Sequence, residues 1–246
     1  MNEWLWFKNL TPDEESAGII TDKSGNGRDG TLVGSAEVFN YAARGKVLNF
    51  PLSASSHVEV TTDTFLPSTG ITMGAWIWRA DNSSAVIAYR ENSWKFWFPY
   101  DDENAGKLCL SVRMDGWWHD ILSDTAVPIQ QWVFVQATFG LSNDGVIFIH
   151  GSARGHTPNV AGSVTCTNAT IMLGKHPTEG RQFHGSIGEF MIRDAYVDLT
   201  THRADLKRWL KREQAKVVEL LELHVPGETL RFCSRPDPIT LTVYDI

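Results

Sequence analysis

The sequence predicts an all-β protein folded as an antiparallel β-sandwich. From the N-terminus to about residue 197, short segments alternate apolar and polar residues with a period of two, as strands with one buried face do. Turn-forming residues separate the segments, most clearly Ser142-Asn-Asp-Gly145, which predicts a hairpin. No helix-length periodicity appears before residue 200. Many short strands joined by turns are typical of a β-sandwich.

The segment Ile71–Trp78 shows the alternation best, because Met73, Ala75 and Ile77 fall on one face and Trp76 falls on the other. Other segments share this period and are expected to form further strands. These segments are Gly45–Phe50, His57–Val60, Ala85–Tyr89, Trp94–Phe98, Leu108–Met114, Trp132–Phe139, Gly145–His150, Ala169–Leu173 and Gly188–Arg193.

Composition limits the possible functions. The chain has 246 residues, of which 42% are hydrophobic and 21% charged, enough for one large domain with a substantial core. A formal charge of -7 argues against a general nucleic-acid-binding protein or a protein held on anionic membranes. No apolar run is long enough for membrane insertion. The three cysteines have no spacing typical of a disulfide framework or a zinc motif, so free thiols are expected.

Two segments far apart in the chain carry the most specific signal. Asp22–Gly34 packs four glycines, an Asn and two Asp into a turn that leads into a strand, and Phe183–Arg193 follows about 160 residues later. Together they resemble the opening and closing strands of a laminin G-like domain, a jelly roll of the concanavalin A-like lectin/glucanase superfamily. The resemblance covers roughly residues 4 to 212. It implies a concanavalin A-like antiparallel β-sandwich, a fold often found outside cells.

In the resembled family, a structural calcium ion often lies where the opening turn meets the closing strand. The matching residues here are Asp22, Asn26 and Glu189, so the resemblance implies one structural Ca²⁺. The family usually has an Asp-Glu pair in the closing strand, and Gly188 replaces its first acid here. A turn held by the hydrogen bonds of its own Asp and Asn side chains is the alternative.

Aromatic residues near two turns are candidates for glycan binding, because sugars stack their C–H faces on rings and bond polar groups through hydroxyls. Two adjacent tryptophans cannot both face the core from one strand, so one is expected to be exposed or under a loop. Arg90 could supply polar contacts, as Arg113 could. Burial in the core is the alternative for each tryptophan taken singly. The predicted glycan-binding residues are Trp97, Tyr100, Arg113, Trp117, Trp118 and His119.

Catalysis is not expected. The glycosidases of the resembled superfamily carry Glu-x-Asp-x-x-Glu on one strand, which aims paired acids at a sugar bond, and this chain has no such run. Its acidic clusters, Asp13–Glu15 and Asp101–Glu103, are expected to be solvated loops. No serine elbow, zinc-protease motif or phosphate loop is present. A divergent glycoside hydrolase is the remaining enzyme alternative.

The C-terminal part departs from the resembled family. We therefore divide the chain into a sandwich at 1–199 and an extension at 200–246. Apolar residues at helical spacing, among them Trp209 and Leu220, predict a helix to about residue 223. Thr200 or Thr201 is expected to cap its start.

The tail that follows this helix alternates like a strand from Ile239 to Ile246. Such a tail could pair with the domain's own sheet or add a strand to a neighbouring chain. We therefore expect the extension to mediate docking or assembly. The residues predicted to do so are Trp209, Leu220, Ile239, Leu241, Val243 and Tyr244.

Two functional hypotheses follow. The first is a lectin-like module that binds a surface polysaccharide. In one version of this hypothesis, it is a free-standing carbohydrate-binding module of a secreted bacterial protein. The second is a component of a larger assembly, such as a phage capsid decoration or tail protein, that contacts copies of itself or other virion proteins. The first residues show no signal peptide, which favours a virion surface, reached by lysis, over secretion. Both place the protein at an outer surface.

Overall fold

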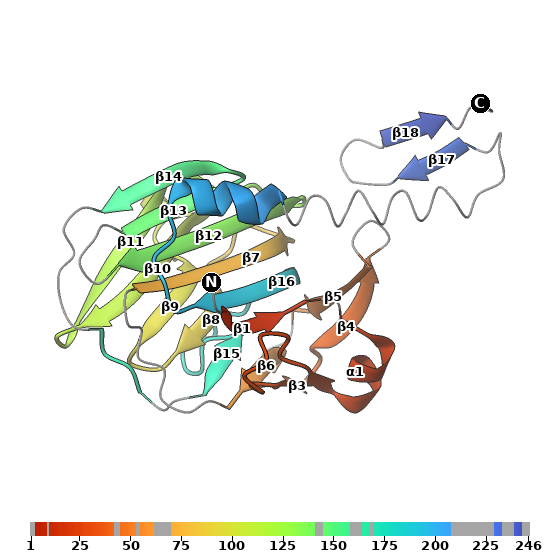
Figure 1. Cartoon of the computed structure of the whole chain (residues 1–246), viewed down its shortest axis with the longest axis horizontal. Coiled ribbons are helices and arrows are strands. Elements are labelled where there is room, and N and C mark those ends of the chain that lie inside the picture. The colour runs from red at the N-terminus through yellow and green to blue at the C-terminus, as the bar shows by residue number, and fades with distance from the viewer. Residues whose placement is uncertain are drawn as a thin grey trace.

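The computed structural model describes residues 3–8, 10–41, 45–52, 55–61, 70–140, 145–157, 164–167, 170–207, 229–232 and 239–242. Two antiparallel eight-stranded sheets, called sheet A and sheet B below, pack face to face (Figure 1). A helix follows the last strand of the sandwich. The predicted antiparallel β-sandwich with a C-terminal helix is therefore confirmed.

Sheet A has the strand order β14-β13-β12-β7-β16-β5-β4, and β1 pairs with β16 beside this path. Each predicted strand that falls in this sheet is present. The bounds are β1 (Glu3–Phe7), β4 (Glu37–Tyr41), β5 (Gly45–Phe50), β7 (Gly70–Arg79), β12 (Trp132–Gly140), β13 (Gly145–Ile149), β14 (Ser152–Thr157) and β16 (Gly185–Arg193).

Sheet B has the strand order β11-β10-β9-β8-β15-β6-β3-β2. Its edge strand β11 was not among the predicted strands, because its polar and aromatic residues do not alternate clearly. The bounds are β2 (Ile19–Ile20), β3 (Gly30–Val33), β6 (His57–Val60), β8 (Ala85–Arg90), β9 (Trp94–Phe98), β10 (Lys107–Met114), β11 (Trp117–Ala126) and β15 (Ile171–Leu173).

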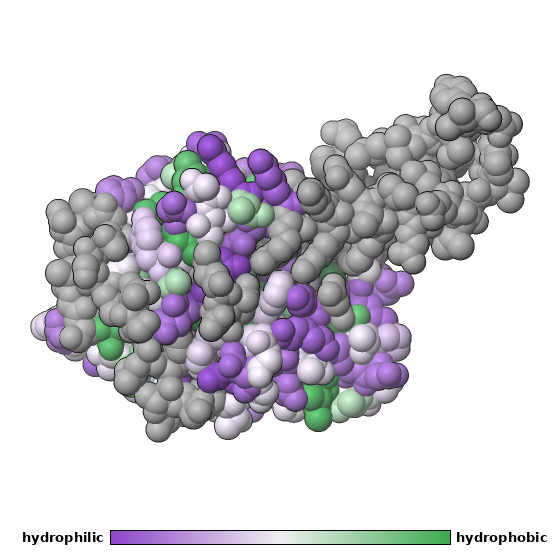
Figure 2. Space-filling model, in the orientation of Figure 1, coloured by the Kyte–Doolittle hydropathy of each residue, from purple (hydrophilic) through white to green (hydrophobic). Residues whose placement is uncertain are grey.

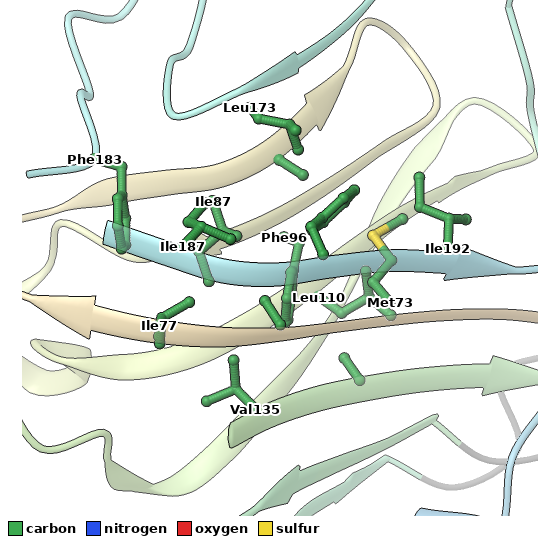
Figure 3. Close-up of a cluster of buried hydrophobic side chains, with 14 of the residues drawn as sticks. Met73, Ile77, Ile87, Phe96, Leu110, Val135, Leu173, Phe183, Ile187 and Ile192 are labelled. Carbon is green, nitrogen blue, oxygen red and sulfur yellow. The ribbon is translucent and has the colours of Figure 1, made fainter. Parts of the chain in front are cut away.

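The main core lies between the sheets, where side chains of β7 and β16 meet those of β9 and β10 (Figure 3). Met73 and Ile77 of β7 point into it, as do Phe96 and Leu110 of sheet B. Trp76, by contrast, belongs to a separate cluster on the outer face of sheet A. The alternation predicted for β7 is therefore confirmed. The outer face of each sheet also carries a hydrophobic cluster separate from the main core.

A short helix, α1 (Pro12–Ala17), occupies a segment for which no helix was predicted. Thr11 and Glu14 form a capping box: the Glu14 carboxylate accepts the Thr11 backbone N–H at 2.6 Å, and the Thr11 hydroxyl accepts the Glu14 N–H at 3.3 Å. Glu14 is buried and forms an ion pair with Lys23 at 2.9 Å. The prediction that Asp13–Glu15 is a solvated loop is therefore wrong, whereas Asp101–Glu103 is exposed as expected.

Residues 199–207 form the helix α2, which begins after Asp198. The Asp198 carboxylate accepts the backbone N–H of Thr201 at 2.7 Å, as an N-cap residue does. The cap is therefore Asp198 rather than Thr200 or Thr201, which lie inside the first turn. The predicted continuation to residue 223, with Trp209 and Leu220, lies outside the described residues.

Two further strands, β17 (Thr229–Phe232) and β18 (Ile239–Thr242), pair with each other as a separate two-stranded sheet. The predicted tail strand is thus present from Ile239 through Leu241 to Thr242, and its partner is β17. Val243 and Tyr244 lie outside the described residues. The assembly role of the extension stays a prediction.

Candidate functional site

A hydrophobic cluster lies on the outer face of sheet B, away from the main core. It contains Trp97 of β9 and Cys109 of β10, which face each other across the two strands, and Leu122 of β11 continues the row. Val86 and Tyr89 of β8 complete the cluster. Since directly opposed residues share a face of the sheet, alternate residues of β9, β10 and β11 also point outward here.

Five residues on this face alternate aromatic rings with cations, and we call them the cation–aromatic ladder. The Arg181 guanidinium carbon lies 4.5 Å from the ring centroid of Tyr100 and 5.0 Å from that of Trp97. The Lys95 ammonium lies 4.5 Å from the ring centroid of Trp97 and 4.8 Å from that of Trp118. These distances are within the range of cation–π attraction. The ladder therefore runs Tyr100, Arg181, Trp97, Lys95, Trp118.

The two ends of the ladder are open to solvent and its middle is not. Tyr100 is 69% exposed and Trp118 is 40% exposed, whereas Trp97 is 6% exposed. The indole N–H of Trp97 donates to the Ser111 hydroxyl at 2.8 Å, which satisfies its buried polar atom. Trp97 thus supports the two cations from beneath, and Tyr100 and Trp118 present ring surface to a ligand.

The hairpin between β10 and β11 places two tryptophans at its tip. Asp115 and Gly116 both have positive φ, at 48° and 88°, as a tight two-residue hairpin requires. Trp117, which follows directly, is 76% exposed, so both Trp117 and Trp118 reach solvent. The prediction that at least one of the pair is exposed is confirmed. Neighbouring residues of a strand point to opposite sides, so only Trp118 shares the outer face with the ladder.

Four of the six predicted glycan-binding residues lie on this face. Trp97, Tyr100 and Trp118 are in the ladder, and Arg113 lies opposite Trp118 across the two strands. Arg113 donates a hydrogen bond to the Asn92 side chain. Trp117 and His119 alternate with Trp118 and point to the other side of β11.

The suggestion that Arg90 supplies ligand contacts is wrong. Arg90 is fully buried, and its guanidinium lies 5.9 Å from the ring centroid of Trp4. It is therefore a structural cation.

Sequence reasoning missed both cations of the ladder. Lys95 could have been found, because it lies two residues before Trp97 on one strand and therefore shares its face. Arg181 lies between β15 and β16, far along the chain, and no local pattern indicates its position. It forms an ion pair with Glu179 at 2.8 Å, which holds the guanidinium beside the rings.

An imidazole borders the ladder. The His176 ring centroid lies 4.4 Å from that of Tyr89, and the His176 Nε2 lies 3.7 Å from Glu179. Burial lowers the pKa of His176. His176 therefore packs as a neutral ring at pH 7, and the positive charge of this region comes from Lys95 and Arg181.

The outer face of sheet A is also rich in aromatic rings, and other elements cover most of them. The Tyr41 ring of β4 lies 6.5 Å from that of Trp78 on β7 and 5.3 Å from that of Trp132 on β12. β4 and β12 are four strand positions apart, which in a flat sheet would separate them by about 19 Å. The sheet therefore curls, and its β4 edge folds over the outer face.

The α2 helix covers another part of this face through a buried polar network. Asp205 accepts two hydrogen bonds from Arg193 of β16, at 2.5 and 3.0 Å, and one from the Gln136 amide at 3.3 Å. The Gln136 carbonyl in turn accepts from His202 Nδ1 at 2.7 Å. His202 Nε2 accepts the Gly151 backbone N–H at 3.1 Å. The network joins α2 to two strands of sheet A, β12 and β16, and to the turn between β13 and β14.

His202 is fully buried, stacked between Phe134 at 5.1 Å and Phe148 at 4.6 Å between ring centroids. Burial lowers the pKa of His202 to about 4, so the ring is neutral at pH 7. On the face of the molecule that shows α2, the described surface is mostly hydrophilic, with hydrophobic residues scattered in small patches (Figure 2). Apart from Phe39 of β4, which is 46% exposed beside Tyr41, the rings described on the outer face of sheet A serve packing. On sheet B, Tyr100 and Trp118 form an open aromatic surface.

The residues of the predicted calcium site do not form a cluster of free ligands. Asp22 Oδ1 accepts the backbone N–H groups of Trp6 and Ser24, at 3.0 and 2.9 Å, and Oδ2 accepts the Ser24 hydroxyl at 2.7 Å. The Asn26 amide donates to the Trp4 carbonyl at 3.0 Å. Glu189 lies in β16.

Within the described ranges, no group of three His, Cys, Asp or Glu side chains is placed to hold a metal ion. These contacts favour the alternative of a turn held by its own hydrogen bonds. The calcium ion stays a prediction.

A cluster of Ser83, Asp81 and His184 is the nearest arrangement to a nucleophilic site. Asp81 accepts from the Ser83 hydroxyl at 2.5 Å and lies 2.9 Å from His184 Nδ1. A serine nucleophile needs the histidine between itself and the carboxylate, whereas here the carboxylate lies between the other two. The cluster therefore joins the loop after β7 to the residue before β16 and does not resemble a catalytic triad.

Comparison with known proteins supports the fold. A family model described as the concanavalin A-like lectin/glucanases superfamily matches residues 52–197, more than half of the chain. No curated protein matches the chain significantly. In the described part of the chain, no helix is long and apolar enough to cross a membrane.

Solved structures similar to this chain are toxin binding domains. The binding domain of Paraclostridial Mosquitocidal Protein 1 matches with a TM-score of 0.69 at 14% identity, over 85% of this chain and 52% of that one. The binding domain of botulinum neurotoxin serotype D/C VPI 5993 matches with a TM-score of 0.65, and that of botulinum neurotoxin DC in complex with SialylT with 0.63, both at the same identity and coverage. The chain spans about half the length of these domains. At this identity the likeness shows the fold alone.

Proposed function

Because the chain belongs to the concanavalin A-like lectin/glucanase superfamily, we propose that it is a non-catalytic, lectin-like module that binds surface glycans through the outer face of sheet B. The observation that carries this proposal is the cation–aromatic ladder, with exposed rings at both ends and N–H donors between them. Sugars stack their apolar faces on such rings and take hydrogen bonds at their edges. The ladder offers both.

The similar toxin domains support a binding role. One was solved with SialylT and another with rat synaptotagmin II, and a third is described as depending on two ganglioside molecules for cell entry. Those ligands belong to those proteins. For this chain they support a receptor-binding module that acts at an outer surface, and they do not name its ligand.

The absence of a catalytic carboxylate run in the sequence supports a non-catalytic module. The ladder contains no carboxylate, and a cation held between rings is suited to ligand contact rather than to proton transfer at a sugar bond. The function proposed is therefore adhesion or receptor binding.

Glycan-array binding of the Trp118→Ala variant tests the proposal. Loss of a stacking ring on an exposed platform should weaken binding about tenfold without changing the fold. The matched control is Trp117→Ala, since Trp117 is more exposed but lies outside the ladder. The control should bind as the wild type does. Equal binding by Trp118→Ala and the wild type would remove the ladder from the proposal.

We also propose that the C-terminal extension docks the module into a larger assembly, such as a phage virion, through other protein chains or copies of itself. The observation that favours this role is the β17–β18 hairpin, whose strands pair with each other and with neither sheet of the sandwich. Light scattering of the full chain beside the chain cut after Glu222 tests it. An oligomer that becomes a monomer on truncation supports assembly. A monomer in both cases supports a free-standing carbohydrate-binding module of a secreted protein.

A further inference from the structure

The Lys95 ammonium differs from Arg181, the other cation of the ladder, because no carboxylate neutralises it. Arg181 is paired with Glu179 at 2.8 Å. For Lys95, no carboxylate among the described residues lies within ion-pair distance, and its ammonium lies over the rings of Trp97 and Trp118. An unpaired cation at a half-buried position is unusual in a chain with a formal charge of -7.

The strand register shows why no acid reaches Lys95. Lys95 faces Ser111 on β10, and Ser111 faces Asp120 on β11. Asp120 is thus two strands away in the same row, about 10 Å. At physiological salt this separation is comparable to the Debye length, so salt screens the attraction and Asp120 neutralises Lys95 only weakly. Ser111 between them is buried, and its hydroxyl accepts from the Trp97 indole N–H. A ligand beside Lys95 therefore meets the ammonium and the Trp118 ring, which lies opposite Arg113 in the next row.

The chemistry of this row selects a ligand class. A sugar ring stacked on Trp118 would place its substituents beside the Lys95 ammonium, 4.8 Å from the Trp118 ring centroid. An ammonium gains most from an ionised oxygen acceptor, because charge-assisted hydrogen bonds are stronger than neutral ones. Arg113, opposite Trp118, adds a second positive group on the same side. A neutral glycan would leave the Lys95 charge unmatched.

Resting on the proposed function of the ladder, we infer that the module prefers glycans that carry a carboxylate, with Lys95 as the residue that binds the carboxylate and Trp118 as the platform for the sugar ring. Sialylated glycans and uronic acid polymers both supply this chemistry. Lys95 is thus a specificity-determining residue, whereas Trp118 and Tyr100 contribute binding that does not depend on charge.

Calorimetry with pairs of probes, one acidic and one neutral, tests this inference. The first pair is polygalacturonate and its methyl ester, which differ in the free carboxylate alone. The second pair is sialyllactose and lactose, which differ in the sugar that bears the carboxylate. The wild type should bind the acidic member about 10- to 100-fold more tightly. The pair with the larger ratio identifies the source of the carboxylate.

The Lys95→Gln variant should bring the ratio between acidic and neutral probes close to one and keep the weaker, charge-independent binding. Lys95→Arg should retain the preference, because it keeps the charge. The matched control is Arg154→Gln, which removes one charge from an exposed residue of β14, away from the ladder. The control should leave the ratio unchanged. Circular dichroism melts establish that each variant is folded.

Four outcomes are distinguishable. Equal binding of acidic and neutral probes by the wild type, or an unchanged ratio in Lys95→Gln, overturns the inference and leaves the glycan-binding function in place. If the wild type binds neither the acidic nor the neutral probes, the inference is overturned for these carboxylated glycans. If Trp118→Ala binds the glycan array as the wild type does, the ladder is not the glycan-binding site. If the ratio of acidic to neutral binding falls toward one in Lys95→Gln alone, the result supports both the carboxylate preference and the glycan-binding role of the ladder.

Discussion

The outer faces of the two sheets carry similar residues and differ in what covers them. On sheet A, the Tyr41 ring contacts Trp78 and Trp132, and Leu206 of α2 packs on the cluster that contains Trp76. Phe39 at the β4 edge is the exposed exception on this face. On sheet B, no comparable element among the described residues covers Tyr100 or Trp118, which stay exposed beside two cations. A count of tryptophans cannot tell these faces apart. The covering elements decide whether an aromatic row stabilises the fold or is available to a ligand.

The same difference applies to the charged groups. Under α2, Arg193 and Asp205 are both buried and satisfy each other. On sheet B, the Lys95 ammonium lies against rings and keeps its capacity to bind an anion. We therefore expect substitutions on sheet A to lower stability, and substitutions at the exposed ends of the ladder to alter binding.

The largest effect is expected from Asp205→Ala. This change leaves the Arg193 guanidinium buried without its carboxylate, which costs about 3–5 kcal/mol for buried ion pairs. Chemical denaturation should show a lower free energy of unfolding, and glycan binding by the folded fraction should persist. The control is Lys207→Ala at an exposed position of α2, which should change stability by less than about 0.5 kcal/mol. Similar stabilities of the two variants would show that the network contributes little.

A pair of substitutions in the ladder separates support from ligand contact. Trp97→Ala removes a buried ring and should cost about 3–5 kcal/mol of unfolding free energy. Trp118→Ala removes an exposed ring and should cost about 0.5 kcal/mol or less. Thermal melts of both variants measure the contrast. Equal losses would mean that the Trp118 ring is part of the packing and not a platform.

Acid should weaken the attachment of α2 through His202. The pKa of His202 is about 4 in the fold, lowered by burial, against about 6.5 in an unfolded chain. Between these values the unfolded chain binds the proton and the folded protein does not, so stability falls as pH drops from 6.5 to 4. The loss from this residue is at most about 3 kcal/mol.

Denaturation of the wild type and of His202→Gln across this pH range measures the effect, and the variant should show a shallower slope. His156→Gln changes an exposed histidine of β14 and should keep the slope of the wild type. A steep slope that persists in His202→Gln would assign the acid sensitivity to other groups.

The smallest effect concerns the opening turn. Both Asp22 carboxylate oxygens already accept hydrogen bonds, so calcium added to chelator-treated protein should give little heat and little change in melting temperature. Calorimetry and a thermal melt measure both. A clear rise in melting temperature would support the calcium site implied by the family resemblance. The Asp22 carboxylate would then act as a metal ligand.

Alternation of apolar and polar residues was sufficient to predict most of the sandwich. Ile71–Trp78 forms β7 with the predicted inward face, because one buried face imposes a period of two. The same rule failed for β11, an edge strand whose residues are exposed on both sides near the hairpin tip. It also missed α1, which depends on a capping box rather than on a long amphipathic pattern.

The site was predicted in part, for a similar reason. Trp97, Tyr100 and Trp118 were selected for their residue type and their nearness to turns, which sequence shows directly. Arg181 reaches them only through the packing of a loop more than 80 residues after Trp97, and no spacing in the sequence records that contact. Which tryptophans are covered, as Trp132 is by Tyr41, depends likewise on the curl of the sheet.

The pairing of the first strand with the last has a mechanical consequence. Glu3 lies opposite Arg193 and Phe7 lies opposite Phe190, so the start of β1 and the end of β16 are at the same end of one antiparallel ladder (Figure 1). A pull on the chain at these two points loads the hydrogen bonds one pair at a time, as in opening a zip, rather than all at once in shear. We expect the sandwich to yield first at β1, at low force, and to release Trp6 while the strands of the inner core remain paired.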